Sequence, residues 1–387
     1  MGIVARSRRS AQLRAAQSLQ DLYPAVGPWT AAALWHGLAP EAAPVPTTPI
    51  DSELDAIVGQ RLAPLMLRYL VQSKAEIPAT AMKSLRDSAF VWASMSHAVI
   101  ASGVKVIERL EGAGFPVAVS KGPGIASVYP NAMDRPYSDI DLLVARRDFA
   151  AVLALLSADG WYEQVRNRQP RKYFYRFCRE AVNLVRESGE SIDVHHHVPP
   201  WLWAIDFDPA SLVGHAVATS VGQGIELPCL TPSDNLLVSA LHIVSDKNQP
   251  GRTLIVWRDL AQLAHAVEPA HAARRAAEVG LAVWLRAVLL GLPSAVRPQP
   301  LIEALGQHTT AQLQHPRRLE ALLERPPEGY RVIRSQLMRL PVLNGVAFIA
   351  GMTFPSREFL REGLGSESYR DWWFRPDVRA RRITSSQ

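Results

Sequence analysis

The chain has 387 residues, of which 48% are hydrophobic and 20% are charged, and its formal net charge is +6. This composition excludes a disordered chain, because enough apolar side chains are present to bury a core, and the length allows two domains or one large domain with extensions. The two cysteines, Cys178 and Cys229, form no CxxC pair, which argues against a disulfide scaffold or a cysteine zinc site. Both are expected to be reduced and buried. The modest positive charge suits an anionic substrate such as a nucleotide.

Two stretches bear on localisation. Residues 1–16 are rich in arginine but lack the apolar run of a secretory signal. The apolar run Val342–Phe354 is too short to cross a bilayer, and it contains Asn344. We therefore expect a soluble, cytoplasmic protein without a membrane partner.

The first part of the chain is expected to be mainly helical. An Arg/Ala- and Pro-rich extension comes first, in which Trp29 and Trp35 indicate that part of it packs against the rest of the protein. Apolar residues then recur at helical spacing up to about Gly114. The longest predicted helix covers residues 79–110 and is broken or bent near Gly103, because glycine weakens a helix.

After Gly114 the periodicity changes from that of helices to that of strands. Helices are expected among the strands over Ile125–Tyr129 and Arg147–Asp159. This order of elements predicts a small α/β unit with a mixed sheet. The expected strands are Phe115–Ser120, Ser138–Val144, Trp161–Val165, Tyr173–Cys178, Val182–Arg186 and Ile192–His196.

The helical pattern returns after Pro199. Thr231 followed by Pro232, with Asp234 in the first turn, is typical of a helix N-terminus, so a helix is expected from Pro232 to Val244. Further helices are expected at Leu254–Val267, Ala270–Val279 and Leu281–Leu290.

The most informative motif is Asp139-Ile140-Asp141, in the second predicted strand. Side chains alternate along a strand, so both carboxylates project from one face, with backbones about 6.5 Å apart. A third acid, Asp193, lies on the last predicted strand. Three carboxylates on two adjacent strands suit one or two Mg²⁺ (or Mn²⁺) ions that carry a nucleoside triphosphate (NTP). Asp139, Asp141 and Asp193 are therefore the predicted catalytic residues and metal ligands.

A glycine-containing turn precedes this motif and predicts a phosphate site. Gly122 and Gly124 let backbone N–H groups approach a phosphate, and the helix that follows adds a favourable dipole. Lys121 could reach a phosphate as a point charge, or be an ordinary lysine at a strand end. Arg135 could clamp a phosphate or orient Asp139, and an ion pair that stabilises the loop is the alternative.

The consecutive histidines His195, His196 and His197 invite comparison with a zinc site. His195 and His197 share a strand face with Asp193, and two histidines with a carboxylate are a metal-ligand set. Three consecutive residues of one strand cannot all point to one ion. A His195 that orients the substrate or a metal ligand is therefore favoured.

The substrate cleft is expected between the sheet and the C-terminal helices. His242 and Asp259 lie on those helices and could help to form the acceptor or nucleotide pocket. A buried polar pair that holds two helices together is the alternative.

Taken together, these residues resemble the nucleotidyltransferase superfamily (the DNA polymerase β-like fold), and most of all its family of uncharacterised bacterial nucleotidyltransferases. The resemblance covers roughly residues 60–290. One departure occurs at the turn after the first strand, where the usual Gly-Gly or Gly-Ser pair is Lys121-Gly122. The motifs that carry the resemblance are Val119-Ser120-Lys121-Gly122, Tyr129-Pro130, Arg135, Asp139-Ile140-Asp141, Gly160-Trp161, Ile192-Asp193-Val194-His195, His242 and Trp257-Arg258-Asp259-Leu260.

The resemblance implies an α+β fold, in which a nucleotidyltransferase-type mixed sheet with helices is flanked by N- and C-terminal helical regions. The expected segments are the N-terminal extension (1–50), an N-terminal helical region (51–114), the nucleotidyltransferase α/β core (115–205), a C-terminal helical domain (206–375) and a basic tail (376–387).

The implied reaction is metal-dependent transfer of a nucleoside monophosphate from an NTP to a hydroxyl or phosphate of a small-molecule, sugar or peptide acceptor, with release of pyrophosphate. Members of the family occur beside polysaccharide- and peptide-modification genes, which implies varied acceptors. Lys121 leaves open a transferase that uses a nucleotide-sugar or another phosphorylated donor and moves the sugar. A non-catalytic nucleotide-binding module is a further alternative. The net charge of +6, without a basic stripe interleaved with aromatic residues, does not favour nucleic acid as a partner.

Overall fold

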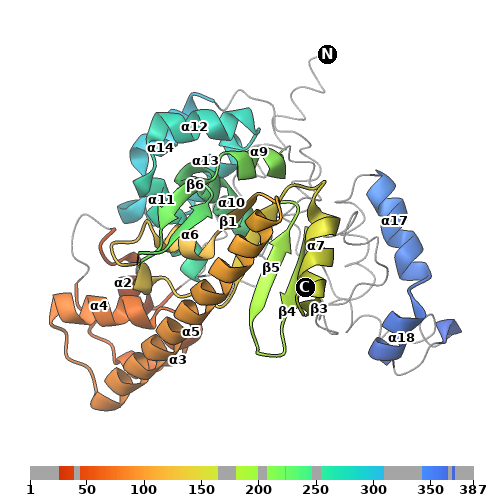
Figure 1. Ribbon diagram of the computed structural model, residues 1–387. Helices are drawn as coiled ribbons and strands as arrows, with labels where there is room; N and C mark the ends of the chain where they lie inside the picture. Colours follow the sequence, from red (N-terminus) through yellow and green to blue (C-terminus); the bar gives the residue numbers. More distant parts are fainter. Residues whose placement is uncertain are drawn as a thin grey trace.

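The computed structural model describes residues 26–38, 44–163, 180–198, 207–222, 224–245, 254–308, 342–364 and 368–370. The expected strand Tyr173–Cys178 lies outside these residues, as do the basic tail and most of the N-terminal extension. The described part is a mixed sheet with helices packed against it and helical regions toward both ends of the chain (Figure 1). The predicted fold class is confirmed.

Seven strands of the described residues form one sheet, in the order β3-β4-β5-β2-β1-β7-β6. The central strand β2 runs antiparallel to β1 and parallel to β5. Each strand predicted inside the described residues is present, with its ends displaced by at most two residues. The bounds are β1 Val117–Ser120, β2 Ile140–Val144, β3 Tyr162–Glu163, β4 Ala181–Val185, β5 Ser191–His195, β6 Val217–Ser220 and β7 Glu226–Cys229.

The hairpin of β6 and β7 corrects the sequence analysis, which expected only helices after Pro199. β7 pairs in parallel with β1 through Cys229 and Val119, so the sheet takes two strands from the segment expected to be helical. Two features weaken the strand pattern there. Pro228 lies inside β7 and cannot donate a ladder hydrogen bond, and β6 is an edge strand whose Val217 is 43% exposed.

The helices between residues 232 and 290 follow the predicted bounds to within one residue. Thr231 Oγ1 accepts a hydrogen bond from the Asp234 N–H at 3.2 Å, as expected for the residue that caps this helix. The helices of the described residues are α2 Pro28–Trp35, α3 Leu54–Gly59, α4 Ala63–Ser73, α5 Ala79–Gly112, α6 Gly122–Ala126, α7 Phe149–Ala158, α9 Pro209–Gly214, α10 Pro232–Ser245, α11 Leu254–Ala266, α12 Pro269–Glu278, α13 Ala282–Leu290, α14 Gln299–Gly306, α17 Val342–Thr353 and α18 Arg357–Leu364.

The long helix α5 is unbroken, so the expected break near Gly103 is wrong. A Cβ added to Gly103 would lie 2.5 Å from Cδ1 of Ile140, which means that glycine is needed because the helix passes close to β2. Within the described residues, α5 is long and apolar enough to cross a membrane, a test that core helices of soluble proteins also pass. Its Ser96 hydroxyl lies 3.2 Å from the Tyr137 carbonyl oxygen, a contact typical of a core helix.

The two faces of the sheet belong to different cores. On one face, Ile140 and Leu142 pack in a cluster with residues of α5 and α7. On the other face, Leu143 joins a larger cluster formed with the helices on the C-terminal side. Because alternate residues of a strand share a face, the side chain of Asp141 projects on the same side as Leu143. The sheet therefore presents its acids toward the C-terminal helices.

The N-terminal helices pack against the C-terminal ones. Trp29 and Trp35 are buried in the same cluster as Trp257 of α11, which confirms that the extension packs against the rest of the protein. The guanidinium of Arg258 donates to the carbonyl oxygen of Leu34 at 2.9 Å. The start of the described chain is therefore fixed to α11 by both packing and hydrogen bonding.

Candidate active site

A row of polar side chains crosses the sheet near the start of β2. The register aligns Asp141 with Asp193 on β5 and with Ser120 on β1, and it aligns Asn183 on β4 with Asp193. Residues aligned across neighbouring strands project from the same face. The prediction that the two acidic motifs lie on adjacent strands is confirmed.

Asp141 is at the centre of this row and is 8% exposed. Its Oδ1 lies 3.3 Å from Nζ of Lys121 and 2.9 Å from Nε2 of His195. Burial by itself would raise the pKa of Asp141, but the charge of Lys121 and the hydrogen bond from His195 outweigh it and hold that pKa well below its usual range. The charged form of Asp141 is therefore favoured.

The other two acids lie in a more negative environment. Burial and the charges of Asp141 and Asp193 raise the pKa of Asp139 from 3.8 to about 6. Burial and the charge of Asp141 also raise the pKa of Asp193, although Asn183 Nδ2 donates to its Oδ1 at 2.6 Å. Lys121 is the cation that these carboxylates share, and their charges raise its pKa against the effect of burial. The cluster has a surplus of negative charge that a divalent cation would neutralise.

Within the described residues, Asp141, Asp193 and His195 form a group with potential metal-ligand atoms that all lie within 4.8 Å of one another. Two carboxylates and an imidazole are an accepted set of donors for a divalent cation. The predicted ligand set had Asp139 where this group has His195. The difference arises because His195 projects from β5 on the same face as Asp193, whereas Asp139 lies just before β2 begins.

The backbone of Lys121 still has the conformation of a glycine, although lysine stands in place of the usual glycine at this turn. Its φ of 58° and ψ of −141° lie in a region that favours glycine, so a lysine here is strained. The side chain of Asn235 on α10 stabilises the turn, because its Oδ1 accepts from the Lys121 N–H at 3.0 Å while its Nδ2 donates to the Leu230 carbonyl at 3.1 Å. The sequence analysis missed Asn235, since its position in a first helical turn gave no sign of a contact so far along the chain.

The two glycines of the turn differ in their surroundings. The short helix begins at Gly122 and not at Ile125 as expected, so both glycines lie inside α6. A Cβ added to Gly124 would lie 3.2 Å from Cβ of Cys229, a free cysteine buried as expected. Gly124 therefore lets α6 pack closely on β7. A role for Gly122 and Gly124 in phosphate binding stays a prediction.

Arg135 and Asp259 form a buried ion pair. Arg135 Nη2 lies 2.8 Å from Oδ2 of Asp259, and Nε lies 3.1 Å from Oδ1, a two-point contact. Tyr129 donates to the same carboxylate at 2.6 Å. Asp259 raises the pKa of Arg135 even though burial opposes it. This geometry corresponds to the structural alternatives, a stabilised loop and a buried polar pair, and the phosphate and pocket roles of the two residues remain untested.

The other two histidines do not join the acids. The ring of His196 packs on Phe149 of α7, with centroids 4.2 Å apart, on the face opposite to His195. His197 lies beyond the end of β5, and burial together with His196 lowers its pKa to about 3. A site with all three histidines is therefore not formed. His242 on α10 is close enough to Asp141 for its positive charge to lower the pKa of that acid.

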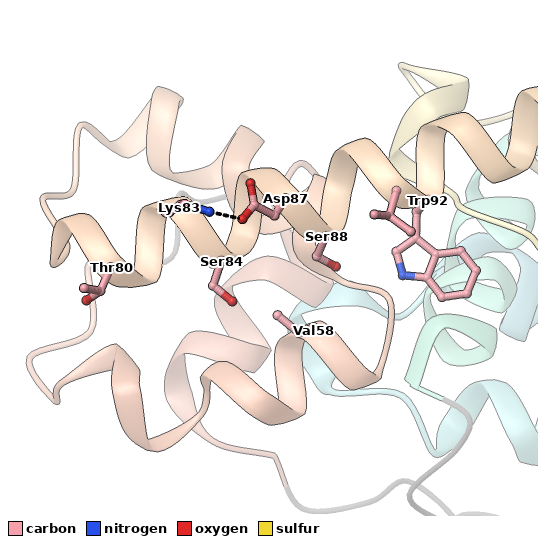
Figure 2. A pocket seen from close by; sticks show the side chains of 8 residues that line it. Val58, Thr80, Lys83, Ser84, Asp87, Ser88 and Trp92 are labelled. Atoms are coloured by element: carbon pink, nitrogen blue, oxygen red, sulfur yellow. Dashed lines mark hydrogen bonds and ion pairs between the residues drawn. The ribbon is translucent and has the colours of Figure 1, made fainter.

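A groove of about 580 Å³ lies between α3 and α5, on the N-terminal side of the molecule (Figure 2). The guanidinium carbon of Arg61 lies 4.4 Å from the centre of the Trp92 ring, which lines this groove. The sequence analysis named neither residue. The lining residues are Val58, Thr80, Lys83, Ser84, Asp87, Ser88, Val91 and Trp92.

A mixed sheet that carries carboxylates on adjacent strands, beside a strand–turn–helix, is the arrangement expected of a nucleotidyltransferase-type protein. Residues 47–293 match the family described as uncharacterised nucleotidyltransferase, and the chain belongs to this family. The matched segment runs from before α3 to just after α13, so it includes the whole sheet and all the site residues described above. Membership implies a nucleotide substrate and a transferase activity. No curated protein matches the chain.

Proposed function

We propose that the protein is a metal-dependent nucleotidyltransferase of the cytoplasm. It moves a nucleoside monophosphate from an NTP to a hydroxyl or phosphate of a small-molecule, sugar or peptide acceptor, and it releases pyrophosphate. The observation that carries this proposal is the group of Asp141, Asp193 and His195, whose ligand atoms lie within 4.8 Å of one another.

The donors of this group fit Mg²⁺ or Mn²⁺, because two of the three are carboxylates. Asp141 and Asp193 would hold the cation, and Asp139, two residues before Asp141, would add a further ligand. When bound, the cation neutralises charge that builds up on the transferred phosphorus and on the leaving pyrophosphate. His195 orients Asp141 through the 2.9 Å contact between Nε2 and Oδ1.

Asp193 is the residue placed to take the proton of the acceptor. Asn183 fixes its Oδ1, which leaves the other carboxylate oxygen for the substrate. The acceptor oxygen bonds to the α-phosphorus while the bond from that phosphorus to the β-phosphate oxygen breaks, and the acceptor proton passes to Asp193.

Lys121 has two roles in this scheme. Without substrate, its Nζ neutralises part of the charge on Asp141 at 3.3 Å. When a cation takes over that charge, the ammonium group becomes available for a phosphate oxygen of the donor. Gly122 and Gly124 complete the proposed phosphate turn, and His242 contributes to the acceptor pocket in this proposal.

Transfer of a sugar from a nucleotide-sugar is the second candidate, and the lysine in place of glycine at position 121 is the observation that favours it. The leaving group separates the two reactions. Incubation with Mg²⁺, each labelled NTP or nucleotide-sugar, and pooled sugar and peptide acceptors should yield pyrophosphate, identified by mass spectrometry. A nucleoside diphosphate product would favour sugar transfer, and Mg²⁺-dependent NTP binding without product would favour a non-catalytic module.

Asp139→Asn and Asp193→Asn should abolish turnover, and full activity in both would overturn the assignment of these acids to the active site.

A further inference from the structure

Arg61 occupies a backbone position at which glycine is the usual residue. It follows α3 with a φ of 62°, in the left-handed region. The Arg61 N–H donates to the Val58 carbonyl at 3.1 Å and the Leu62 N–H to the Ile57 carbonyl at 2.9 Å, the hydrogen-bond pattern of a Schellman motif. An L-residue with a long side chain is disfavoured here relative to glycine. Any advantage of arginine over glycine at this position therefore comes from its side chain.

The guanidinium of Arg61 is held by an aromatic ring and not by an acid. Its carbon lies 4.4 Å from the centre of the Trp92 ring, a distance typical of a cation–π contact. Among the residues that the structure describes, none forms an ion pair or a side-chain hydrogen bond with this guanidinium. Two other arginines of the N-terminal half are paired with acids: Arg68 with Asp134 at 2.5 Å, and Arg135 with Asp259 at 2.8 Å. Arg61 therefore has donors available for a ligand.

The surroundings of Arg61 connect it to the acids of the sheet. Trp92 lies one turn before Ser96 on α5, and the Ser96 hydroxyl hydrogen-bonds both the N–H and the carbonyl of Tyr137 at 3.2 Å. Tyr137 is followed closely by Asp139. The charge of Asp139 raises the pKa of Arg61 against the effect of burial, and Arg61 in turn lowers that of Asp139, so the two charges interact.

We infer that Arg61, held by Trp92, binds a phosphate group of the substrate. A guanidinium that is positioned by an aromatic ring and carries free N–H donors matches the geometry of phosphate oxygens. Its connection to the acids through Trp92, Ser96 and Tyr137 favours the triphosphate of the donor, because a metal held by the acids would bring that triphosphate close to them. This inference rests on the proposed function, since it assigns Arg61 to the same substrate.

The variant that tests it is Arg61→Gly, because glycine suits the backbone and removes only the side chain. The matched control is Lys74→Gly, which removes the same charge at another residue with positive φ, 55°, at the end of α4. Calorimetric titration with Mg²⁺ and each of ATP, GTP, CTP and UTP, and with Mg-pyrophosphate, measures the affinities. We expect Arg61→Gly to raise the Kd of the preferred NTP and of pyrophosphate about 10- to 100-fold, in line with the loss of charge-assisted hydrogen bonds. The Kd of the matching monophosphate should not rise, and the melting temperature should not fall.

The outcomes separate this inference from the proposed function. Suppose that wild type binds Mg-NTP, that Asp141→Asn abolishes this binding, and that Arg61→Gly leaves it unchanged. Arg61 then does not bind a phosphate of the donor. A parallel titration with inorganic phosphate then shows whether Arg61 binds a phosphate of the acceptor instead. A loss of phosphate affinity in Arg61→Gly alone assigns the site to an acceptor phosphate, and no loss overturns the inference. If wild type binds neither Mg-NTP nor Mg-pyrophosphate, the proposed function itself fails. A loss in Lys74→Gly equal to that in Arg61→Gly would also overturn the inference, because it would show a general charge effect.

Discussion

Asp141 and Asp259 are both buried carboxylates, yet their surroundings differ in charge balance. Asp259 is 1% exposed, and its oxygens receive hydrogen bonds from Arg135 and from a tyrosine hydroxyl. Asp141 is 8% exposed, and Lys121 and His195 both contact its Oδ1 while two further carboxylates lie around it. The first site is neutral as it stands, and the second carries a surplus of negative charge.

This difference distinguishes a structural ion pair from a candidate binding site. A buried pair with its hydrogen bonds satisfied holds a loop against a helix, and it destabilises the protein strongly when one partner is removed. Crowded carboxylates cost stability in the absence of a cation, and proteins retain such clusters where a ligand neutralises them. The same Asp→Asn change is therefore expected to act mainly on cation binding at Asp141 and on stability at Asp259.

The largest effect is expected for Asp141→Asn. This change removes the carboxylate shared by Lys121 and His195, so Mn²⁺ affinity and turnover should fall by about 10³-fold or more. The melting temperature in EDTA should fall as well, because the pKa of Asp141 is held below its usual range, so its charge stabilises the folded protein and balances that of Lys121. Isothermal titration with Mn²⁺ and a thermal melt in EDTA measure the two quantities.

Asp87→Asn is the control for that experiment. Asp87 pairs with Lys83 on the surface of α5, and its side chain is 61% exposed. Surface pairs of this kind contribute little, so neither metal affinity nor melting temperature should change. Wild-type affinity for Mn²⁺ in Asp141→Asn would contradict the metal site.

The second effect concerns stability. Asp259→Asn leaves Arg135 buried without a counter-charge, so the free energy of unfolding should fall by about 3 kcal/mol, with Mn²⁺ affinity unchanged. Denaturant titration measures the loss. The double variant Arg135→Met with Asp259→Leu should lose less than the sum of the single changes, because no unpaired charge remains. A loss of NTP affinity without a loss of stability would instead give Arg135 and Asp259 the substrate roles predicted from the sequence.

A smaller effect is expected from pH. The pKa of Asp139 is raised from 3.8 to about 6 in the folded protein, so between these values the folded state binds more protons than the unfolded chain. Stability in EDTA should therefore increase, by roughly 1–2 kcal/mol, as the pH falls from about 7 to about 5. Asp139→Asn should remove most of this gain, and saturating Mn²⁺ should remove it as well. A flat or opposite pH profile in EDTA would contradict the surplus of negative charge.

The sequence predicted those parts of the fold that local patterns determine. Alternation placed the strands that carry Asp141 and Asp193, and a capping pattern at Thr231 placed the start of α10. Local propensity failed where tertiary packing decides the outcome. Gly103 was expected to break α5, but it lies in an unbroken helix because Ile140 approaches it closely. The strand β7 was missed because Pro228 weakens its pattern.

The position of Asp141 and Asp193 on adjacent strands was predictable, and the contacts around the candidate site were not. Asp139, Asp141 and Asp193 stand out because carboxylates interrupt apolar strands. The contacts of Lys121 with Asn235, and the approach of Arg61 to Trp92, join residues far apart in the sequence. No spacing rule brings such pairs together, because they depend on how helices from both sides of the sheet meet its edge.

The smallest expected effect separates charge from backbone strain at Lys121. Lys121→Gly and Lys121→Met both remove the cation beside Asp141, but only glycine suits a φ of 58° and a ψ of −141°. The glycine variant should therefore be more stable than the methionine variant by about 1 kcal/mol, measured by denaturant titration. Both should bind Mn²⁺ at least as tightly as wild type, because a competing ammonium group is gone, and both should bind NTP more weakly if Lys121 contacts a phosphate. Equal stability of the two variants would show that the backbone at position 121 is not strained. Weaker Mn²⁺ binding in both would show that Lys121 positions Asp141 and does not compete with the cation.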